Sequence, residues 1–140
     1  EVDPDFAAAT WHKLLVNAVA GLMVLTGRKS GVFRRADVAA LGRAYLAECL
    51  AVARAEGADL DESVVEETVA LFTHVPEDLT TSILTDREHG RPLEWDIRNG
   101  VIGRLARTHG IPTPISDVVV PLLAAASDEM DGTAEDRARR

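Results

Sequence analysis

The amino-acid sequence predicts an all-α fold, a single multi-helix domain without a β-sheet. The 140 residues are 46% hydrophobic but only 4% aromatic, and the apolar residues are mostly Ala, Leu and Val, a composition that favours helices. Apolar residues recur at helical spacing in segments that Gly and Pro separate. No segment shows the alternation of apolar and polar residues that is typical of a half-buried strand.

The helix boundaries follow from capping residues and helix breakers. Asp3 and Pro4 are a cap and a first-turn proline, and Gly27 ends the helix that they begin. Near the other end of the chain, Thr113 is expected to cap a helix whose first residue is Pro114. Six helical segments are expected, at about 5–26, 37–56, 61–75, 80–89, 93–108 and 114–126.

The sequence is expected to contain one domain and a short tail. Residues 1–126 should form the helical domain, and residues 127–140, which are polar and mixed in charge, should form a frayed tail. The length excludes a complete enzyme with separate cofactor and substrate domains. The first residue is Glu1 and not Met, which indicates a piece of a longer protein.

The charge and the cysteine count exclude several classes of protein. The net charge is 15 − 23 = −8, and an acidic chain repels the phosphates of nucleic acids. No apolar run approaches the roughly 20 residues that span a bilayer, so no membrane partner is expected. The one cysteine, Cys49, excludes an internal disulfide and is expected to be buried in a helix, which fits a reducing, cytoplasmic setting. The four histidines lack metal-ligand spacing, so no metal site is expected.

Polar residues interrupt the first helix, which is otherwise apolar nearly all round and therefore expected at the centre of the fold. Lys13 and Asn17 are spaced i and i+4, so they lie on one face, and Gly21 continues that face. A buried lysine or amide without a partner costs several kcal/mol, so such a strip lines a cavity or contacts a ligand. The alternative is that Lys13 extends into solvent near the helix start while Asn17 satisfies a loop carbonyl.

A second group of polar residues lies between Ser82 and Gly100. Glu94 is expected in the first turn of a helix, where the helix dipole alone favours a carboxylate. Asp86 can form an ordinary surface ion pair with Arg87 or Arg91. No glycine-rich phosphate loop follows a strand anywhere, so the sequence contains no nucleotide-binding site of the α/β kind.

Several motifs in register resemble the C-terminal domain of ketopantoate reductases. The segment 11–18, WHKLLVNA, is similar to the Trp-x-Lys-Leu-x-x-Asn opening of that domain, and Glu48 and Gly57 match its second helix. The segments 82–86 (SILTD), 94–100 (EWDIRNG) and 109–114 (HGIPTP) resemble its later motifs at the expected separations. The resemblance covers the chain from about Trp11 to Ala126.

This resemblance implies a fold, a reaction and site residues. The fold is the helical domain of ketopantoate reductase, one of the 6-phosphogluconate dehydrogenase-like helical domains, packed against an N-terminal nucleotide-binding domain that is absent here. That domain would bind most of the NADPH, and a homodimer is a further expected partner. The reaction is the NADPH-dependent reduction of a 2-oxo acid, as in pantothenate and coenzyme A biosynthesis, and this chain alone is expected to be inactive.

The resemblance also assigns roles to individual residues. Lys13 corresponds to the general acid, and Glu94 to a catalytic glutamate that faces the cofactor and the reacting centre. Asn17 and Ser82 correspond to substrate-binding residues. Two positions depart from the family: Gly21 and Ser30 stand where asparagines usually contact the hydroxyl end of ketopantoate. Their loss should weaken discrimination for that hydroxyl, which leaves the true substrate open.

A hypothesis from another class stays beside the reductase. The chain is alternatively a non-enzymatic helical module that binds a ligand or forms a dimer, because Ala-rich helical effector domains have a similar composition. Such domains follow a helix-turn-helix segment, which this sequence lacks. A strand followed by Gly-x-Gly-x-x-Gly upstream of Glu1 would favour the reductase.

Overall fold

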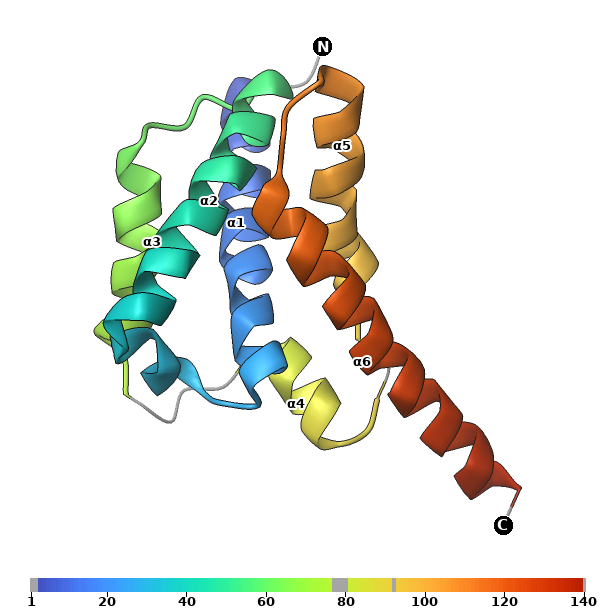
Figure 1. Ribbon diagram of the computed structural model, residues 1–140. Coiled ribbons are helices and arrows are strands. Elements are labelled where there is room, and N and C mark those ends of the chain that lie inside the picture. Colours follow the sequence, from blue (N-terminus) through green and yellow to red (C-terminus); the bar gives the residue numbers. More distant parts are fainter. Residues whose placement is uncertain (1–2, 77–80, 92, 140) are drawn as a thin grey trace.

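The computed structural model describes residues 3–76, 81–91 and 93–139, without the side chains of Pro4, Ser82 and residues 129–138. Every regular element in the described residues is helical, as the sequence predicts (Figure 1). In chain order the elements are α1 (Pro4–Thr26), η1 (Ser30–Arg34), α2 (Ala36–Ala55), α3 (Ser63–Thr73), α4 (Ser82–Glu88), η2 (Asp96–Gly100), α5 (Val101–His109) and α6 (Pro114–Ala138).

Helix α1 is the centre of the domain. It packs against α2, α3, α4, α6 and η2, and its residues Leu15, Val19 and Met23 are fully buried (Figure 1). The side chain of Asp3 accepts a hydrogen bond from the backbone N–H of Asp5 at 3.0 Å, and Gly27 ends the helix with φ +64°. A left-handed residue of this kind is usually glycine because it lacks a Cβ. The predicted boundaries and central position of this helix are confirmed.

By length and composition, α1 is also apolar enough to cross a membrane. Within residues 5–26, a stretch of 18 residues has the mean hydropathy of a membrane-spanning helix. The prediction that no apolar segment approaches the length of a membrane span is therefore wrong. Half of that window is buried inside the domain, under the helices that surround α1. A central core helix passes the same test because it buries its apolar side chains against other helices.

The segment between α1 and α2 is more regular than the predicted loop. It contains the 3₁₀ turn η1, whose residues Val32 and Phe33 are buried. The ring of Phe33 packs against the ring of Phe72 in α3, with centroids 4.9 Å apart. Ser30 is also buried and donates its hydroxyl to the carbonyl of Pro76 at 2.7 Å. The turn therefore packs against both α2 and α3 and contributes its buried residues to the core.

The predicted helix at 93–108 is not a plain α-helix. Residues Asp96–Gly100 form a π-helical turn, η2, that continues directly into α5. Wide turns of this kind are rare and occur often at functional sites. In this turn the side chain of Asn99 donates two buried hydrogen bonds. These hydrogen bonds stabilise a turn whose backbone geometry is less favourable than that of an α-helix.

Helix α6 is longer than predicted and begins with a different cap. It continues through residues 127–138, where the sequence predicted a tail. Ser127, in the first part of this extension, is buried and accepts a hydrogen bond from the backbone N–H of Leu93 at 3.0 Å. At the other end, the first N–H groups are capped by Glu48 of α2, whereas the sequence predicted the side chain of Thr113.

Candidate active site

The accessible polar face of α1 is short. Lys13 is exposed, Asn17 is half-buried, and Gly21 is buried. Successive i+4 positions rotate by about 40° around a helix of 3.6 residues per turn, so a row that begins in solvent turns into the core within two steps. The predicted strip therefore consists of Lys13 and Asn17, and Gly21 does not belong to it.

The surroundings of Gly21 explain why that position is a glycine. A Cβ atom there would lie 3.1 Å from Cδ1 of Leu123 and 3.2 Å from Nδ2 of Asn99. The helix backbone thus approaches α6 and η2 closely, and a larger side chain would displace one of them. Ser30, the second departure from the family pattern, is likewise taken up by the core, through its hydrogen bond to Pro76. Neither residue contacts open space.

Lys13 is the exposed cation of α1. In the described part of the chain, no hydrogen bond or ion pair joins it to another residue, so its ammonium group is available to a ligand. It lies on a helix that packs against α2, α3, α4, α6 and η2, which fixes the backbone that carries it, although Phe6 and Thr10 in the turns before it are exposed. A cation on a rigid element suits the stabilisation of negative charge that develops on a bound molecule.

Glu94 lies immediately before the helix formed by η2 and α5, next to the N-cap residue Trp95. Its side chain is 56% exposed, and its Oε2 accepts a hydrogen bond from Nη2 of Arg98 at 3.0 Å. The Arg98 side chain is only 15% exposed, so the better-buried partner orients the carboxylate. The prediction that Glu94 lies in the first turn of a helix is wrong by one or two residues, because the acidic residue of that turn is Asp96. The ion pair with Arg98 was not predicted.

Ser82 is the first residue of α4, and its side chain lies outside the described residues. Its neighbours Ile83 and Leu84 are fully buried, and α4 packs against α1. Asp86, further along this helix, forms a surface ion pair with Arg91 at 3.0 Å, as the sequence suggested.

Two elements that carry or directly follow predicted site residues pack against α1. Both α4, with Ser82, and η2, which follows Glu94, pack against the helix that carries Lys13 and Asn17. Within the described residues no hydrogen bond or ion pair links Lys13, Asn17 and Glu94 directly.

The segment around Glu94 that resembles the family contains residues with structural roles. Asp96 forms an ion pair with Arg104 of α5. Asn99 is fully buried and donates Nδ2 to the carbonyl of Ala18 at 3.0 Å and to the hydroxyl of Tyr45 at 2.9 Å. At Gly100 a Cβ atom would lie 2.7 Å from Oδ1 of Asp96, so a larger residue would displace the Asp96 side chain. The motif therefore fixes the turn that positions Glu94.

Two buried acids lie next to each other on α2. Burial raises the pKa of the Tyr45 hydroxyl, and it raises the pKa of the Cys49 thiol as well. Cys49 has no exposure, which confirms that it is a buried core residue. Both side chains stay protonated near neutral pH, so neither is a nucleophile or a base for the site.

Two contacts that sequence reasoning missed join distant motifs. The Glu48 carboxylate accepts hydrogen bonds from the backbone N–H groups of Ile115 at 2.7 Å and Ser116 at 3.1 Å. His109 places Nε2 2.7 Å from Oε1 of Glu56, at the adjoining ends of α5 and α2. The sequence alone could not identify the partners of Glu48 and Glu56, because these partners are brought close only by the tertiary packing of the helices.

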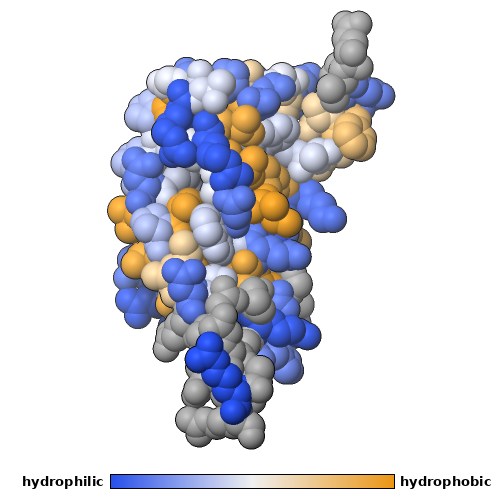
Figure 2. All heavy atoms as spheres, turned by 90° about the vertical axis from the view of Figure 1, so that its right-hand side faces the viewer, coloured by the Kyte–Doolittle hydropathy of each residue, from blue (hydrophilic) through white to orange (hydrophobic). Residues whose placement is uncertain are grey.

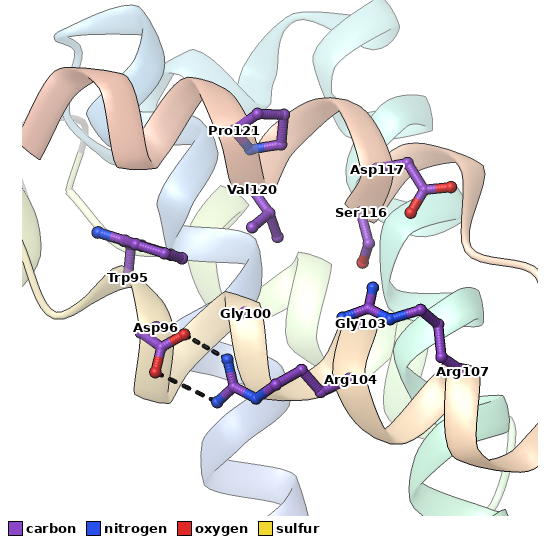
Figure 3. A pocket seen from close by; sticks show the side chains of 10 residues that line it. All are labelled: Trp95, Asp96, Gly100, Gly103, Arg104, Arg107, Ser116, Asp117, Val120 and Pro121. Atoms are coloured by element: carbon purple, nitrogen blue, oxygen red, sulfur yellow. Dashed lines mark hydrogen bonds and ion pairs between the residues drawn. The ribbon is translucent and has the colours of Figure 1, made fainter.

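The described pockets do not contain the predicted site residues. One pocket, of about 370 Å³, lies between α5 and α6, and Figure 3 shows Trp95 and Arg107 at its edges and Ser116 beside it. The face that carries α5 and α6 is largely hydrophilic, with hydrophobic atoms exposed beside the charged side chains (Figure 2). Among the described residues, no group of three or more His, Cys, Asp or Glu side chains could hold a metal ion.

Comparison with known proteins gives one consistent result. Residues 5–127 match the family described as "Ketopantoate reductase PanE/ApbA C terminal". The chain is 68% identical over 128 residues to a 2-dehydropantoate 2-reductase of Mycobacterium tuberculosis, and the match covers 91% of this chain and 43% of that protein. It is 37% identical over 123 residues to a 2-dehydropantoate 2-reductase of Caulobacter vibrioides, covering 88% of this chain and 42% of the relative.

The fold agrees with the sequence comparison. The dimeric ketopantoate reductase of Staphylococcus aureus superimposes with a TM-score of 0.84 and 29% identity, over 93% of this chain and 45% of that protein. The chain therefore spans less than half the length of the relatives that it matches.

Proposed function

Because the chain belongs to the ketopantoate reductase family, as its C-terminal helical domain, we propose that it is the substrate-binding and proton-donating half of an NADPH-dependent 2-oxo-acid reductase. The observation that carries the proposal is the exposed Lys13 on the central helix of the domain, within the region that matches the family. An ammonium group that remains accessible on a rigid core helix is suited to act on a ligand rather than to stabilise the fold.

The described residues fit one end of NADPH and not the whole molecule. They include no strand and no glycine-rich loop at a helix N-terminus, which are the features that bind the phosphates of a dinucleotide. Glu94 and Lys13 lie on accessible surface beside α1 and are polar groups that suit the reacting end. The phosphates would accordingly be bound by an N-terminal nucleotide-binding domain.

Lys13 has two roles in the proposed reaction. When bound, NADPH supplies a hydride to the carbonyl carbon of the substrate, and the carbonyl electron pair moves onto oxygen. The Lys13 ammonium stabilises this negative charge and transfers one proton to the oxygen, which yields the hydroxyl of the product. The neutral amine then regains its proton from water.

The other residues hold and orient the reactants. Asn17, half-buried one turn after Lys13, presents an amide that can hydrogen-bond a substrate hydroxyl. Ser82 is proposed as a further hydrogen-bonding group for the substrate. Glu94 is proposed to face the cofactor and the reacting centre, with Arg98 holding its carboxylate in place.

The proposed substrate and assembly are supported by the relatives. Two of them are named 2-dehydropantoate 2-reductase, which supports ketopantoate as substrate and a place in pantothenate synthesis. The dimeric reductase of Staphylococcus aureus supports a homodimer. A cytoplasmic location remains part of the proposal. The buried positions of Gly21 and Ser30 mean that any hydroxyl selectivity of this domain depends on Asn17 and Ser82.

The test is an assay of the two-domain protein that contains this chain. With NADPH and 2-dehydropantoate, we expect oxidation of NADPH that is followed at 340 nm and is stoichiometric with the hydroxy acid formed. The control substrate is the 2-oxo acid that lacks the terminal hydroxymethyl group, and a lower kcat/KM is expected for it. Absence of reduction with both substrates would contradict the proposal. Tight NADPH binding by the 140-residue chain alone would contradict the division of roles between the domains.

A further inference from the structure

The pocket between α5 and α6 contains polar groups that the fold does not use. Its volume of about 370 Å³ lies within the range of sites that bind small molecules. The turn η2 and α5 form one side of it and α6 forms the other (Figure 3). None of Lys13, Asn17, Ser82 and Glu94 lines this pocket, so the proposed reaction leaves it without a role.

Four charged side chains line the pocket, and two of them form an ion pair with each other, Asp96 with Arg104. In the described part of the chain, the side chains of Arg107 and Asp117 form neither a hydrogen bond nor an ion pair. The guanidinium of Arg107 lies over the bare backbone of Gly103, where a Cβ atom would be 3.6 Å from Nη1. The pocket therefore offers one available cation and one available anion.

Helix α6 contributes two further polar groups to the pocket wall. Oγ of Ser116 is buried and makes no hydrogen bond, although it lies close to the hydroxyl of Tyr45. Pro121 has no N–H, so the carbonyl of Asp117, four residues earlier, lacks the donor that an α-helix normally provides. Buried polar atoms are nearly always hydrogen-bonded in folded proteins, so an unsatisfied hydroxyl in a pocket wall points to a missing partner.

The rest of the wall is apolar. Trp95 and Val120 are half-buried and extend toward the space between the helices (Figure 3). The Trp95 ring lies over Gly100, where a Cβ atom would be 3.1 Å from Cζ3. An aromatic ring beside a branched aliphatic side chain is a surface on which an apolar group packs. The apolar wall and the charged groups thus face the same space.

We propose that this pocket binds a free amino acid with an apolar side chain. Arg107 pairs with the carboxylate of the ligand, which also accepts a hydrogen bond from the hydroxyl of Ser116. The ammonium group of the ligand donates to the carboxylate and the backbone carbonyl of Asp117. The ligand side chain packs against Trp95 and Val120. A ligand with a single charge would leave either Arg107 or Asp117 without a partner.

The test uses three ligands that share one apolar body. L-Phenylalanine carries both charges, 3-phenylpropanoate carries only the carboxylate, and L-phenylalaninamide carries only the ammonium group. Calorimetric titration of the two-domain protein should show binding of phenylalanine, with each singly charged ligand at least about tenfold weaker because it loses a set of charge-assisted hydrogen bonds. The indole N–H resonance of Trp95, assigned with Trp95→Phe, should shift during the titration, and that of Trp11 should not.

Matched variants separate the two ends of the ligand. Arg107→Gln and Asp117→Asn should each weaken phenylalanine binding at least about tenfold. Arg107→Gln should weaken 3-phenylpropanoate without affecting phenylalaninamide, and Asp117→Asn should do the reverse. Arg28→Gln and Asp59→Asn change exposed residues outside the pocket and should leave all affinities unchanged. Circular dichroism checks that the variants fold.

Three results would overturn the proposal. The first is the absence of binding for both phenylalanine and leucine up to their solubility limits. The second is 3-phenylpropanoate or phenylalaninamide binding as tightly as phenylalanine, since the site would then recognise one charge only. The third is an equal loss of affinity in Arg107→Gln and Arg28→Gln. The inference does not depend on the proposed function, because the titrations do not require reductase activity.

Discussion

Asn99 and Tyr45 share a hydrogen bond at the centre of the domain, from Nδ2 of Asn99 to the hydroxyl of Tyr45 over 2.9 Å. The same nitrogen donates to the carbonyl of Ala18 at 3.0 Å, so one amide joins η2, α2 and α1. Both side chains are fully buried. The turn before α5, and with it the position of Glu94, is therefore fixed to the helix that carries Lys13.

Replacing Asn99 should destabilise the fold more than it alters the chemistry. Asn99→Ala leaves the Tyr45 hydroxyl without its donor and opens a cavity, which should cost about 2–4 kcal/mol of unfolding free energy. Denaturant unfolding of Asn99→Ala, Tyr45→Phe and the double variant measures the coupling between the two residues. A coupling of about 1 kcal/mol is expected, and strictly additive effects would contradict the shared hydrogen bond.

The buried acids of α2 predict a loss of stability at alkaline pH. Burial raises the pKa of Tyr45 and of Cys49, so above about pH 9 the unfolded chain releases protons that the folded chain retains. The unfolding free energy should be unaffected by these groups below that pH and fall as the pH rises above it. Thermal midpoints between pH 7 and 11 check the direction. A decline of equal slope in Tyr45→Phe/Cys49→Ala would show that other groups cause it.

The cap that α2 supplies to α6 gives a third prediction. Glu48→Ala removes the acceptor for two N–H groups of the first turn and should lower stability by about 1–2 kcal/mol, whereas Glu48→Gln keeps one acceptor and should lose less. Glu67→Ala, an exposed glutamate of α3, is the control and should stay within about 0.5 kcal/mol of the parent. Equal midpoints for Glu48→Ala and Glu67→Ala would refute the capping role.

Sequence patterns predicted much of the fold because helix boundaries are local. Asp3, Gly27 and Pro114 stand at or next to ends of helices where their backbone preferences place them. The patterns could not predict the cap by Glu48, since it depends on contacts between residues distant in the sequence. The π-turn at Asp96–Gly100 was missed for the same reason.

The site was predicted from sequence only in part. The i, i+4 spacing placed Lys13 and Asn17 on one face, and the structure leaves that face accessible. The same spacing failed at Gly21, because a straight helix rotates the third position into the core. Only the family resemblance associated Glu94 and Ser82 with Lys13, and the packing of η2 and α4 on α1 is consistent with it.

The packing of Gly21 predicts that the family asparagine cannot be restored there. Gly21→Asn would force a side chain against Leu123 and Asn99 and should cost about 1–3 kcal/mol through overpacking. The kcat/KM of the two-domain protein for 2-dehydropantoate should not rise. Thermal unfolding and steady-state kinetics of this variant provide the check. A tenfold gain in kcat/KM at unchanged stability would show that position 21 faces the substrate.

The central claim is that Lys13 is the proton donor of the reductase, and steady-state kinetics of Lys13→Ala in the two-domain protein test it most directly. The sequence has one other lysine, Lys29, which is exposed before η1 and provides the matched control Lys29→Ala. Loss of a general acid should lower kcat by about 10²–10⁴ with the thermal midpoint unchanged, while Lys29→Ala keeps the parent value. A kcat for Lys13→Ala within about threefold of the parent, at an unchanged midpoint, would contradict the assignment.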